Sequence, residues 1–252
     1  MMQESVIEVR DLVIGYEKNV VMQNLNFSVA RGEVFCIMGG SGCGKSTLMK
    51  HMIGLFRPMA GDIRLFGRSI VAADEDEKRK LMQRFGVTYQ GGALFGSMTV
   101  AENVMLPLAE YTDLTESEQR EVAEAKLKQV DLGGYGDYMP AELSGGMRKR
   151  AGMARALALN PELLFCDEPS AGLDPITSAG LDRLILRMRE ESGVTIVVVT
   201  HDLDSAFTIG EHVIMLDKEA KTIVAEGTPA ELRDHSPNGW VREFLSRDGL
   251  KH

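Results

Sequence analysis

A glycine-rich loop between a predicted strand and a predicted helix constrains this chain more than any other feature. Residues 33–38 are largely apolar and strand-like, and residues 45–56 carry apolar side chains at helical spacing. Between them, residues 39–46 read GGSGCGKS and fit the pattern G-x-x-x-x-G-K-[S/T]. A loop with a strand before it and a helix after it is typical of α/β proteins that hold nucleotide phosphates.

The chemistry of this loop follows from its residue types. Glycines let backbone N–H groups converge on phosphate oxygens without obstruction by side chains. We expect Lys45 to reach the β- and γ-phosphates and the Ser46 hydroxyl to bind Mg²⁺. The alternative is a chance glycine-rich turn, which the flanking strand and helix disfavour. The predicted ATP-binding residues of the loop are Gly39, Gly40, Ser41, Gly42, Cys43, Gly44, Lys45, Ser46 and Thr47.

The rest of the chain alternates between strand and helix patterns. Residues 6–36 read as short strands joined by turns, and residues 61–67 as another short strand. Continuous apolar runs at 163–166 and 194–199 are typical of central parallel strands covered on both faces. The pattern from about 99 to 160 is helical. We therefore predict an α/β nucleotide-binding core with a helical insert at about residues 91–158.

Acidic side chains follow one of these central strands. Asp167 and Glu168 come at the carboxyl end of the run 163–166, where ligands bind in open α/β sheets. We expect Asp167 to hold Mg²⁺ and Glu168 to polarise the attacking water. His201 follows the strand 194–199 and is the candidate sensor of the γ-phosphate. The alternatives are a solvated acidic cap and a structural histidine.

A second glycine-containing motif begins another predicted helix. In Leu143-Ser144-Gly145-Gly146-Met147 the serine is a natural N-cap, and the glycines expose N–H groups at a helix start. One ATP does not need two phosphate sites about 100 residues apart, but two chains packed head to tail would use both. We therefore predict a homodimer in which Ser144, Gly145, Gly146 and Met147 face the nucleotide held by the other copy. A plain helix cap is the alternative.

Composition restricts the partners and the compartment. The formal net charge of −9 argues against nucleic acid as the main partner, since phosphate binding needs a basic face. The local basic clusters 78–80 and 148–150 are interpreted first as solvated helix faces. The three cysteines have no metal or disulfide spacing, which favours a reducing compartment. We see no signal peptide core and no apolar run of about 18 residues, so a membrane role requires a partner.

Taken together, these ordered motifs resemble those of the ATP-binding cassette ATPases over essentially the whole chain. The resemblance rests on the loop 39–46, the strand and glutamine at 87–90, the signature 143–147, the acidic pair 167–168, the segment 170–174 and His201. It implies a P-loop NTPase fold with a RecA-like core, an N-terminal antiparallel β subdomain and a helical insert. It also implies that Tyr16 stacks on adenine, that Gln90 contacts Mg²⁺ and senses a permease, and that Asp174 bridges two subunits.

The segments 90–104 and 142–150 are most similar to those of the ATPases of MCE-type lipid transporters, such as the bacterial Mla phospholipid system. This resemblance implies two ATPase copies beneath two integral-membrane permease subunits, on the cytoplasmic face of the bacterial inner membrane. It further implies a periplasmic MCE-domain protein and a small cytoplasmic STAS-domain protein. The implied activity is ATP hydrolysis coupled to phospholipid movement between inner and outer membranes, which maintains outer-membrane lipid asymmetry.

One residue departs from the family pattern. The signature usually ends in glutamine, whereas this chain has Met147. Glutamine three residues after the N-cap could complete a capping box, and methionine cannot. We expect weaker polar contact with the opposite nucleotide, without loss of activity.

Two segments and the choice of substrate leave alternatives open. Ala93, Leu94, Phe95 and Met98 form either a docking surface for the permease or internal packing of the insert. We place the ATPase domain at residues 1–240 and a tail at 241–252, with a helix starting near 237. Its apolar stripe, Trp240, Val241, Phe244 and Leu245, packs either on its own domain or on a partner. A cassette for another small solute, or a non-transport cassette ATPase, is the alternative function.

Overall fold

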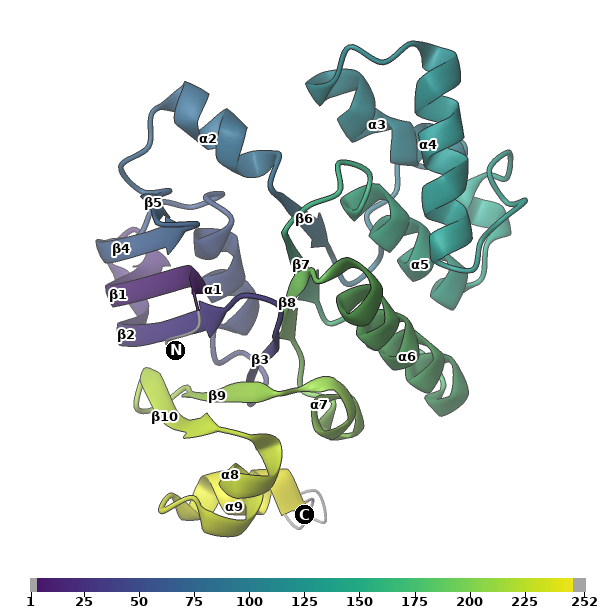
Figure 1. Ribbon diagram of the computed structural model, residues 1–252. Helices are drawn as coiled ribbons and strands as arrows, with labels where there is room; N and C mark the ends of the chain where they lie inside the picture. The colour runs from purple at the N-terminus through teal and green to yellow at the C-terminus, as the bar shows by residue number, and fades with distance from the viewer. Residues whose placement is uncertain (1–3, 247–252) are drawn as a thin grey trace. The chain divides into compact units, whose positions relative to one another are not determined.

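The computed structural model describes residues 4–246 and divides the chain into two compact units. Unit 1 contains residues up to Leu81 and from Thr195 onward, and unit 2 contains Met82–Val194. Figure 1 labels the helices and strands of the described residues. Within residues 4–246, no helix combines the length and hydrophobicity needed to cross a membrane.

Unit 1 begins with an antiparallel sheet, as the resemblance implied. Its strand order is β2-β1-β4-β5. The long first strand alternates between buried and exposed residues, because one of its faces packs on the core. The strands are β1 (Ser5–Tyr16), β2 (Asn19–Ala30), β4 (Ala60–Leu65) and β5 (Arg68–Ser69).

A second set of strands in unit 1 has the order β10-β9-β3-β8. The strands β3 (Val34–Gly39), β8 (Thr195–Val199) and β9 (His212–Asp217) run parallel. All residues of β3 and β8 are buried, as their continuous apolar sequences predicted. An antiparallel edge strand, β10 (Thr222–Gly227), completes the set.

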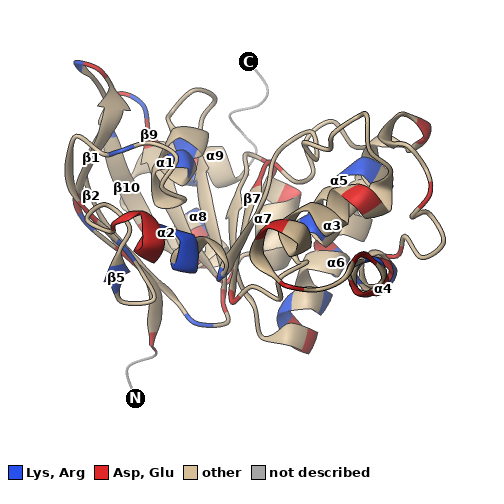
Figure 2. Ribbon diagram, turned by 90° about the horizontal axis from the view of Figure 1, so that it is seen from above, with Lys and Arg blue, Asp and Glu red and all other residues tan. Residues whose placement is uncertain are grey.

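Unit 1 contains five short helices among its described residues. They are α1 (Lys45–Met52), α2 (Glu75–Met82, whose last residue falls in unit 2), α7 (Leu203–Ile209), α8 (Pro229–His235) and α9 (Gly239–Ser246). Figure 2 shows that α2 carries both acidic and basic residues. Its only buried residue is Leu81, which agrees with a solvated face for the cluster 78–80.

Two element boundaries were predicted wrongly, and residues with left-handed backbone explain both. The helix expected over 45–56 ends at Met52, since Gly54 adopts a left-handed backbone, and Leu55 is then 57% exposed. The strand expected over 61–67 ends at Leu65, because Phe66 and Gly67 have φ angles of 52° and 76° and form a turn.

The C-terminal helix begins at Gly239, two residues later than predicted. Val241 and Leu245 are buried, and α9 packs on α8 (Figure 1). Trp240 and Phe244 are half-buried, and their rings contact each other. The structure thus supports packing of this stripe on its own unit. Residues 247–252, the end of the predicted tail, lie outside the described residues.

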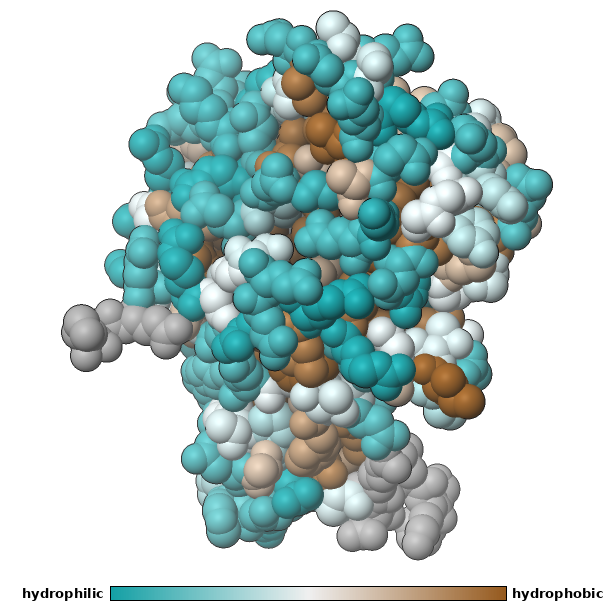
Figure 3. All heavy atoms as spheres, turned by 45° about the vertical axis from the view of Figure 1, so that its right-hand side comes forward, coloured by the Kyte–Doolittle hydropathy of each residue, from teal (hydrophilic) through white to brown (hydrophobic). Residues whose placement is uncertain are grey.

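Unit 2 contains the predicted helical region together with a parallel strand pair. The strands are β6 (Phe85–Thr88) and β7 (Leu163–Asp167). The helices are α3 (Val100–Tyr111), α4 (Glu116–Gln129), a short 3-10 helix (Pro140–Glu142), α5 (Gly145–Ala156) and α6 (Pro175–Ser192). Capping boxes begin α3 and α4, at Thr99 with Glu102 and at Thr115 with Glu118. The face drawn in Figure 3 is largely hydrophilic, with separate apolar areas.

Candidate nucleotide site

The phosphate loop of unit 1 joins β3 to α1. Lys45 is 7% exposed, and its Nζ donates to the carbonyl oxygens of Gly39 at 2.9 Å and Gly40 at 3.1 Å. Gly39 needs to be glycine, because its φ is 145° and a Cβ there would overlap with the carbonyl oxygen of Leu216. The ammonium group is therefore held within the loop, whose backbone can approach a phosphate closely.

The other loop residues fit a non-covalent role. Cys43 is buried, and burial raises the pKa of its thiol. A protonated thiol is a poor nucleophile, so Cys43 fills space in the loop. The three cysteines are all buried thiols outside any disulfide, and burial raises the pKa of the Cys166 thiol to about 12.

Tyr16 and His201 also belong to unit 1. Tyr16 is 45% exposed, and its hydroxyl lies 3.2 Å from the Thr47 hydroxyl, next to the phosphate loop. The β3 and β8 strands pair in parallel, with Ile37 opposite Val199, so their carboxyl ends share one edge. The N–H of Thr200 donates to the Ile37 carbonyl at 3.2 Å. This pairing brings the exposed His201 to the edge from which the phosphate loop begins.

Unit 2 brings a second group of predicted residues together. β6 and β7 pair in parallel, with Thr88 opposite Cys166, so Gln90 and Asp167 follow at the same edge. Asp167 is 8% exposed, and Glu168 has a φ of 49°, which is unusual for a residue with a side chain. Strained backbone of this kind clusters at functional sites.

The signature motif begins α5 as predicted. The Ser144 Oγ accepts a hydrogen bond from the N–H of Met147 at 3.2 Å, and no capping box forms with the methionine. A shallow pocket in unit 2 is lined by residues from three places in the chain: Gln90, the signature helix and the segment that follows Asp167 and Glu168. Its lining residues are Gln90, Gly91, Gly145, Arg148, Lys149, Ala171, Gly172 and Leu173.

Asp174 acts within its own chain as the N-cap of α6. Its carboxylate accepts from the N–H groups of Ile176 and Thr177, both at 3.1 Å, and from the Thr177 hydroxyl at 2.6 Å. The hydrogen bond from the Thr177 side chain is the main cause that lowers the pKa of Asp174. This carboxylate is therefore kept ionised beside the exposed Ile176.

The segment after Gln90 is held by hydrogen bonds from polar side chains whose role the sequence did not predict. Asn103 is fully buried; it accepts from the N–H of Phe95 at 2.7 Å and donates to the carbonyls of Phe95 and Met98. Arg155 donates to the Ala93 carbonyl at 2.8 Å. With its backbone held in this way, Phe95 remains 57% exposed. An asparagine in a helical pattern gives no sequence signal for this role.

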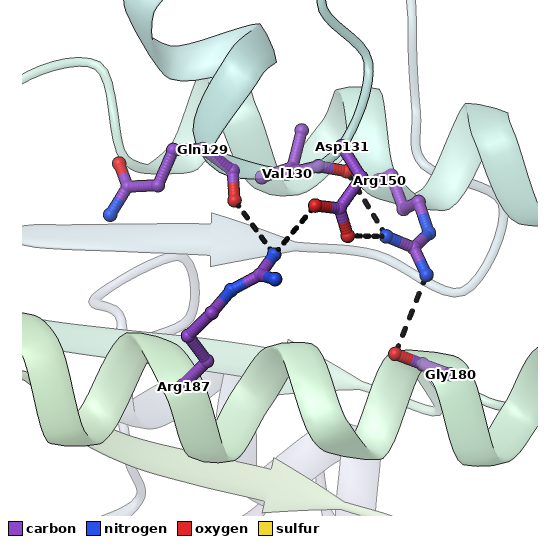
Figure 4. Close-up of polar contacts among 6 residues, drawn as sticks. All are labelled: Gln129, Val130, Asp131, Arg150, Gly180 and Arg187. Atoms are coloured by element: carbon purple, nitrogen blue, oxygen red, sulfur yellow. Dashed lines mark hydrogen bonds and ion pairs between the residues drawn. The ribbon is translucent and has the colours of Figure 1, made fainter.

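A cluster of ion pairs that the sequence did not predict connects three helices of unit 2. Figure 4 shows Asp131, just after α4, between Arg150 of α5 and Arg187 of α6. Its carboxylate accepts from Arg150 at 2.6 Å and from Arg187 at 3.0 Å. Burial raises the pKa of Asp131, but hydrogen bonds and charges from both arginines outweigh burial and hold it below its ordinary value. In the cluster 148–150, Arg150 is thus a structural residue rather than part of a solvated face.

Comparison with known proteins identifies the family. The model of the family described as "ABC transporter" matches residues 22–171. The chain belongs to the ABC transporter family. It is therefore an ATP-binding cassette whose activity is ATP hydrolysis coupled to transport, as the sequence motifs predicted.

Curated relatives extend the similarity over nearly the whole cassette. It is 41% identical over 240 residues to the probable ribonucleotide transport ATP-binding protein mkl of Mycobacterium leprae, covering 95% of this chain and 68% of that protein. It is 39% identical over 253 residues to the intermembrane phospholipid transport system ATP-binding protein MlaF of Escherichia coli, covering 99% of this chain and 92% of that protein.

Solved structures confirm the predicted fold. A dimeric ATP-binding cassette in a post-hydrolysis state with ADP and phosphate matches with a TM-score of 0.80 and 31% identity, covering 88% of this chain and 98% of that one. The cassette cbiO1 of Clostridium perfringens matches with a TM-score of 0.83 and 28% identity, covering 99% of this chain and 96% of that one.

Proposed function

We propose that this cassette hydrolyses ATP to drive phospholipid movement between the inner and outer membranes of a bacterium. One observation supports phospholipid as the substrate: the similarity to an intermembrane phospholipid transport ATPase extends over 99% of this chain and 92% of that protein. Outer-membrane lipid asymmetry is the property that such transport maintains. The chain's own residues account for the ATPase chemistry.

The proposed roles in unit 1 follow from the phosphate loop. The backbone N–H groups of residues 39–47 and the N-terminus of α1 bind the phosphates, and Lys45 neutralises the β- and γ-phosphate charge. Tyr16 stacks on adenine from its exposed position beside Thr47. His201 donates a hydrogen bond as charge develops on the γ-phosphoryl group.

The proposed roles in unit 2 belong to the hydrolytic and signature residues. Glu168 accepts a proton from the attacking water, or orients that water, from the end of β7. Ser144, Gly145 and Gly146 bind the γ-phosphate held by a second copy, and Met147 adds only apolar contact there. Asp174 bridges the two copies. The dimeric relative of known structure supports a homodimer.

The residues proposed to hold Mg²⁺ are Ser46, Gln90 and Asp167. They offer a hydroxyl, an amide and a carboxylate oxygen, which suit a hard cation that keeps several waters. Within residues 4–246 no group of three or more His, Cys, Asp or Glu side chains could hold a metal ion. When bound, Mg²⁺ would neutralise charge on the β- and γ-phosphate oxygens.

The proposed partners are two permease subunits, a periplasmic MCE-domain protein and a cytoplasmic STAS-domain protein, with the cassette peripheral on the cytoplasmic face of the inner membrane. The permease docks at Ala93, Leu94, Phe95 and Met98. The rigid backbone of this segment and the 57% exposure of Phe95 support that surface.

A ribonucleotide or another small solute is the second candidate substrate. The 41% identity to the mycobacterial ribonucleotide transport protein favours it. A gentle detergent pull-down of the tagged full-length protein, analysed by mass spectrometry for proteins and lipids, separates the two. Recovery of a permease with bound phospholipid supports the proposal. Recovery of a permease with ribonucleotide and no lipid would overturn the assignment of phospholipid as the substrate.

The docking surface is tested in the same pull-down with Phe95→Asp. A charge in an apolar contact costs several kcal/mol unless it is paired, so we expect permease recovery to fall at least about tenfold. Leu55→Asp is the matched control, because Leu55 is also 57% exposed but lies in unit 1. Equal recovery with both variants would contradict docking at Phe95.

A further inference from the structure

A buried lysine in the signature helix contacts the backbone at the hydrolytic glutamate. Lys149 lies in α5, five residues after Ser144, and is 8% exposed. Its Nζ donates to the carbonyl oxygen of Glu168 at 3.1 Å and to that of Pro169 at 2.7 Å. A buried ammonium group with two main-chain acceptors fixes the position of those carbonyls strongly, since hydrogen bonds from a charged donor are the stronger kind.

The backbone that Lys149 holds has an unfavourable conformation. Glu168 has a φ of 49°, a left-handed conformation that is unfavourable for a residue with a side chain. The Glu168 carbonyl also accepts from the N–H of Ala171 at 3.2 Å, and Leu173 donates to Ser170 at 3.1 Å. These bonds stabilise a tight turn after β7, and the direction of the Glu168 side chain depends on that turn.

We propose that Lys149 is a positioning residue for ATP hydrolysis, which ties the signature helix to the Glu168 backbone and so aims the glutamate carboxylate. The proposal rests on the hydrolytic role proposed above for Glu168. Because Ser144 and Lys149 belong to one helix, a phosphate bound at the start of α5 is linked mechanically to the carboxylate. Hydrolysis is thereby coupled to occupation of the signature motif.

The surroundings explain why a lysine suits this position. Burial lowers the pKa of Lys149, and the negative charge of Glu168 opposes that effect. The ammonium group offers three donors at the end of a flexible stem and can bond two neighbouring carbonyls at once. Arginine would place a larger, planar guanidinium group with a fixed donor geometry at this point.

The test compares Lys149→Met and Lys149→Arg in the full-length protein. Methionine keeps the apolar stem but removes both hydrogen bonds. We expect kcat to fall about 10- to 100-fold, because the Glu168 carboxylate is no longer held in its orientation. The KM for ATP should stay within about threefold, because the phosphate loop is unchanged. Arginine should give an intermediate kcat. Should the methionine variant fail to fold, the arginine variant alone carries the test.

The matched control is Lys126→Met in the same unit. Burial lowers the pKa of Lys126 as well, but its Nζ donates to the Asn160 side chain at 2.6 Å, away from the turn after β7. It should keep the wild-type kcat. A wild-type kcat in the Lys149 variants, or an equal loss in the Lys126 variant, would overturn the positioning role.

A double variant shows whether Lys149 acts through Glu168. In a Glu168→Gln background, Lys149→Met should cause no further loss of the residual kcat, since the carboxylate that Lys149 orients is absent. A further loss of the same size would mean that Lys149 acts by another route, which overturns the proposal. Brisk hydrolysis by Glu168→Gln alone would instead refute the role of Glu168, so the two failures are distinguishable.

Discussion

Left-handed backbone occurs in both units at residues proposed to act on ATP. In unit 1, Gly39 and Gly44 border the phosphate loop with φ angles of 145° and 104°. In unit 2, Glu168 has a φ of 49° although it carries a side chain. Glycine adopts such angles without strain, whereas the Glu168 carbonyl accepts a hydrogen bond from the buried Lys149. At the scale of single residues, the site is therefore built by backbone geometry as much as by side chains.

Replacing Lys45 by alanine should remove most of the nucleotide affinity. The ammonium group is held in the loop by the Gly39 and Gly40 carbonyls, and hydrogen bonds to charged groups contribute about 1.5–3 kcal/mol each. We expect the Kd for ATP to rise about 10- to 100-fold in a calorimetric titration. Lys50→Ala, near the end of the same helix, is the control and should bind like wild type. Unchanged affinity in Lys45→Ala would contradict the phosphate-loop assignment.

The residues of the site differ in how far sequence alone could predict them. Lys45, Asp167 and Glu168 belong to local patterns whose chemistry depends on neighbours in the chain. Lys149 and Asn103 depend on partners brought close only by folding; Lys149 looks like part of a charged cluster until its contacts with Glu168 and Pro169 are known. A periodic pattern predicts which face of a helix is buried, but not which polar group that face must bond.

At the scale of elements, the signature helix is fixed at several points along its length. Ser144 caps its start, Lys149 bonds the turn after β7, and Arg150 pairs with Asp131. The Asp131 carboxylate also binds Arg187 of α6, as Figure 4 shows. Asp131 thus joins the middle of α5, at Arg150, to the second half of α6, at Arg187.

Asp131→Asn should lower the free energy of unfolding by about 1 kcal/mol at neutral pH, since it replaces a carboxylate bound by two arginines. Asp131 is 53% exposed, so solvent screening keeps the effect small. Asparagine tolerates the φ of 61° at this position, which avoids a separate effect of strain. Denaturant unfolding of the full-length protein measures the difference.

The same variant has a defined pH dependence. The folded pKa of Asp131 lies below its ordinary value, so its stabilising effect is complete above the unfolded pKa of about 3.9. The effect is lost as pH falls through the folded pKa. The free energies of unfolding of wild type and Asp131→Asn should therefore differ by a constant amount from about pH 5 to 7 and converge below about pH 4.

The control is Asp137→Asn, at a more exposed pair with Arg120, which should change stability by less than about 0.5 kcal/mol throughout. A difference that persists unchanged at low pH would refute the ion-pair explanation.

Element boundaries were less predictable than element types. Continuous apolar runs correctly predicted the buried strands β3, β7 and β8. The end of α1 and the end of β4 depend on left-handed residues, Gly54 and Phe66, whose angles the apolar pattern does not encode. For α9, the buried Val241 and Leu245 fit the predicted apolar stripe, but the choice of packing partner required the structure.

At the scale of the whole molecule, the predicted ATP residues are divided between two compact units. Unit 1 carries Tyr16, the phosphate loop and His201, and unit 2 carries Gln90, the signature and the acidic pair. The family match and the dimeric relative support a cassette that pairs with a second copy. We propose that ATP binds between two copies of the chain and that Glu168 then hydrolyses it.

The most direct test is the oligomeric state and ATP turnover of the full-length Glu168→Gln variant. With ATP and Mg²⁺ present, light scattering should detect a stable dimer, because the phosphate loop and signature still bind nucleotide. Removal of the carboxylate that we propose polarises water should lower turnover at least about 100-fold. Lys45→Ala in this background should stay monomeric. Brisk turnover by Glu168→Gln, or a monomer at saturating ATP, would contradict the account.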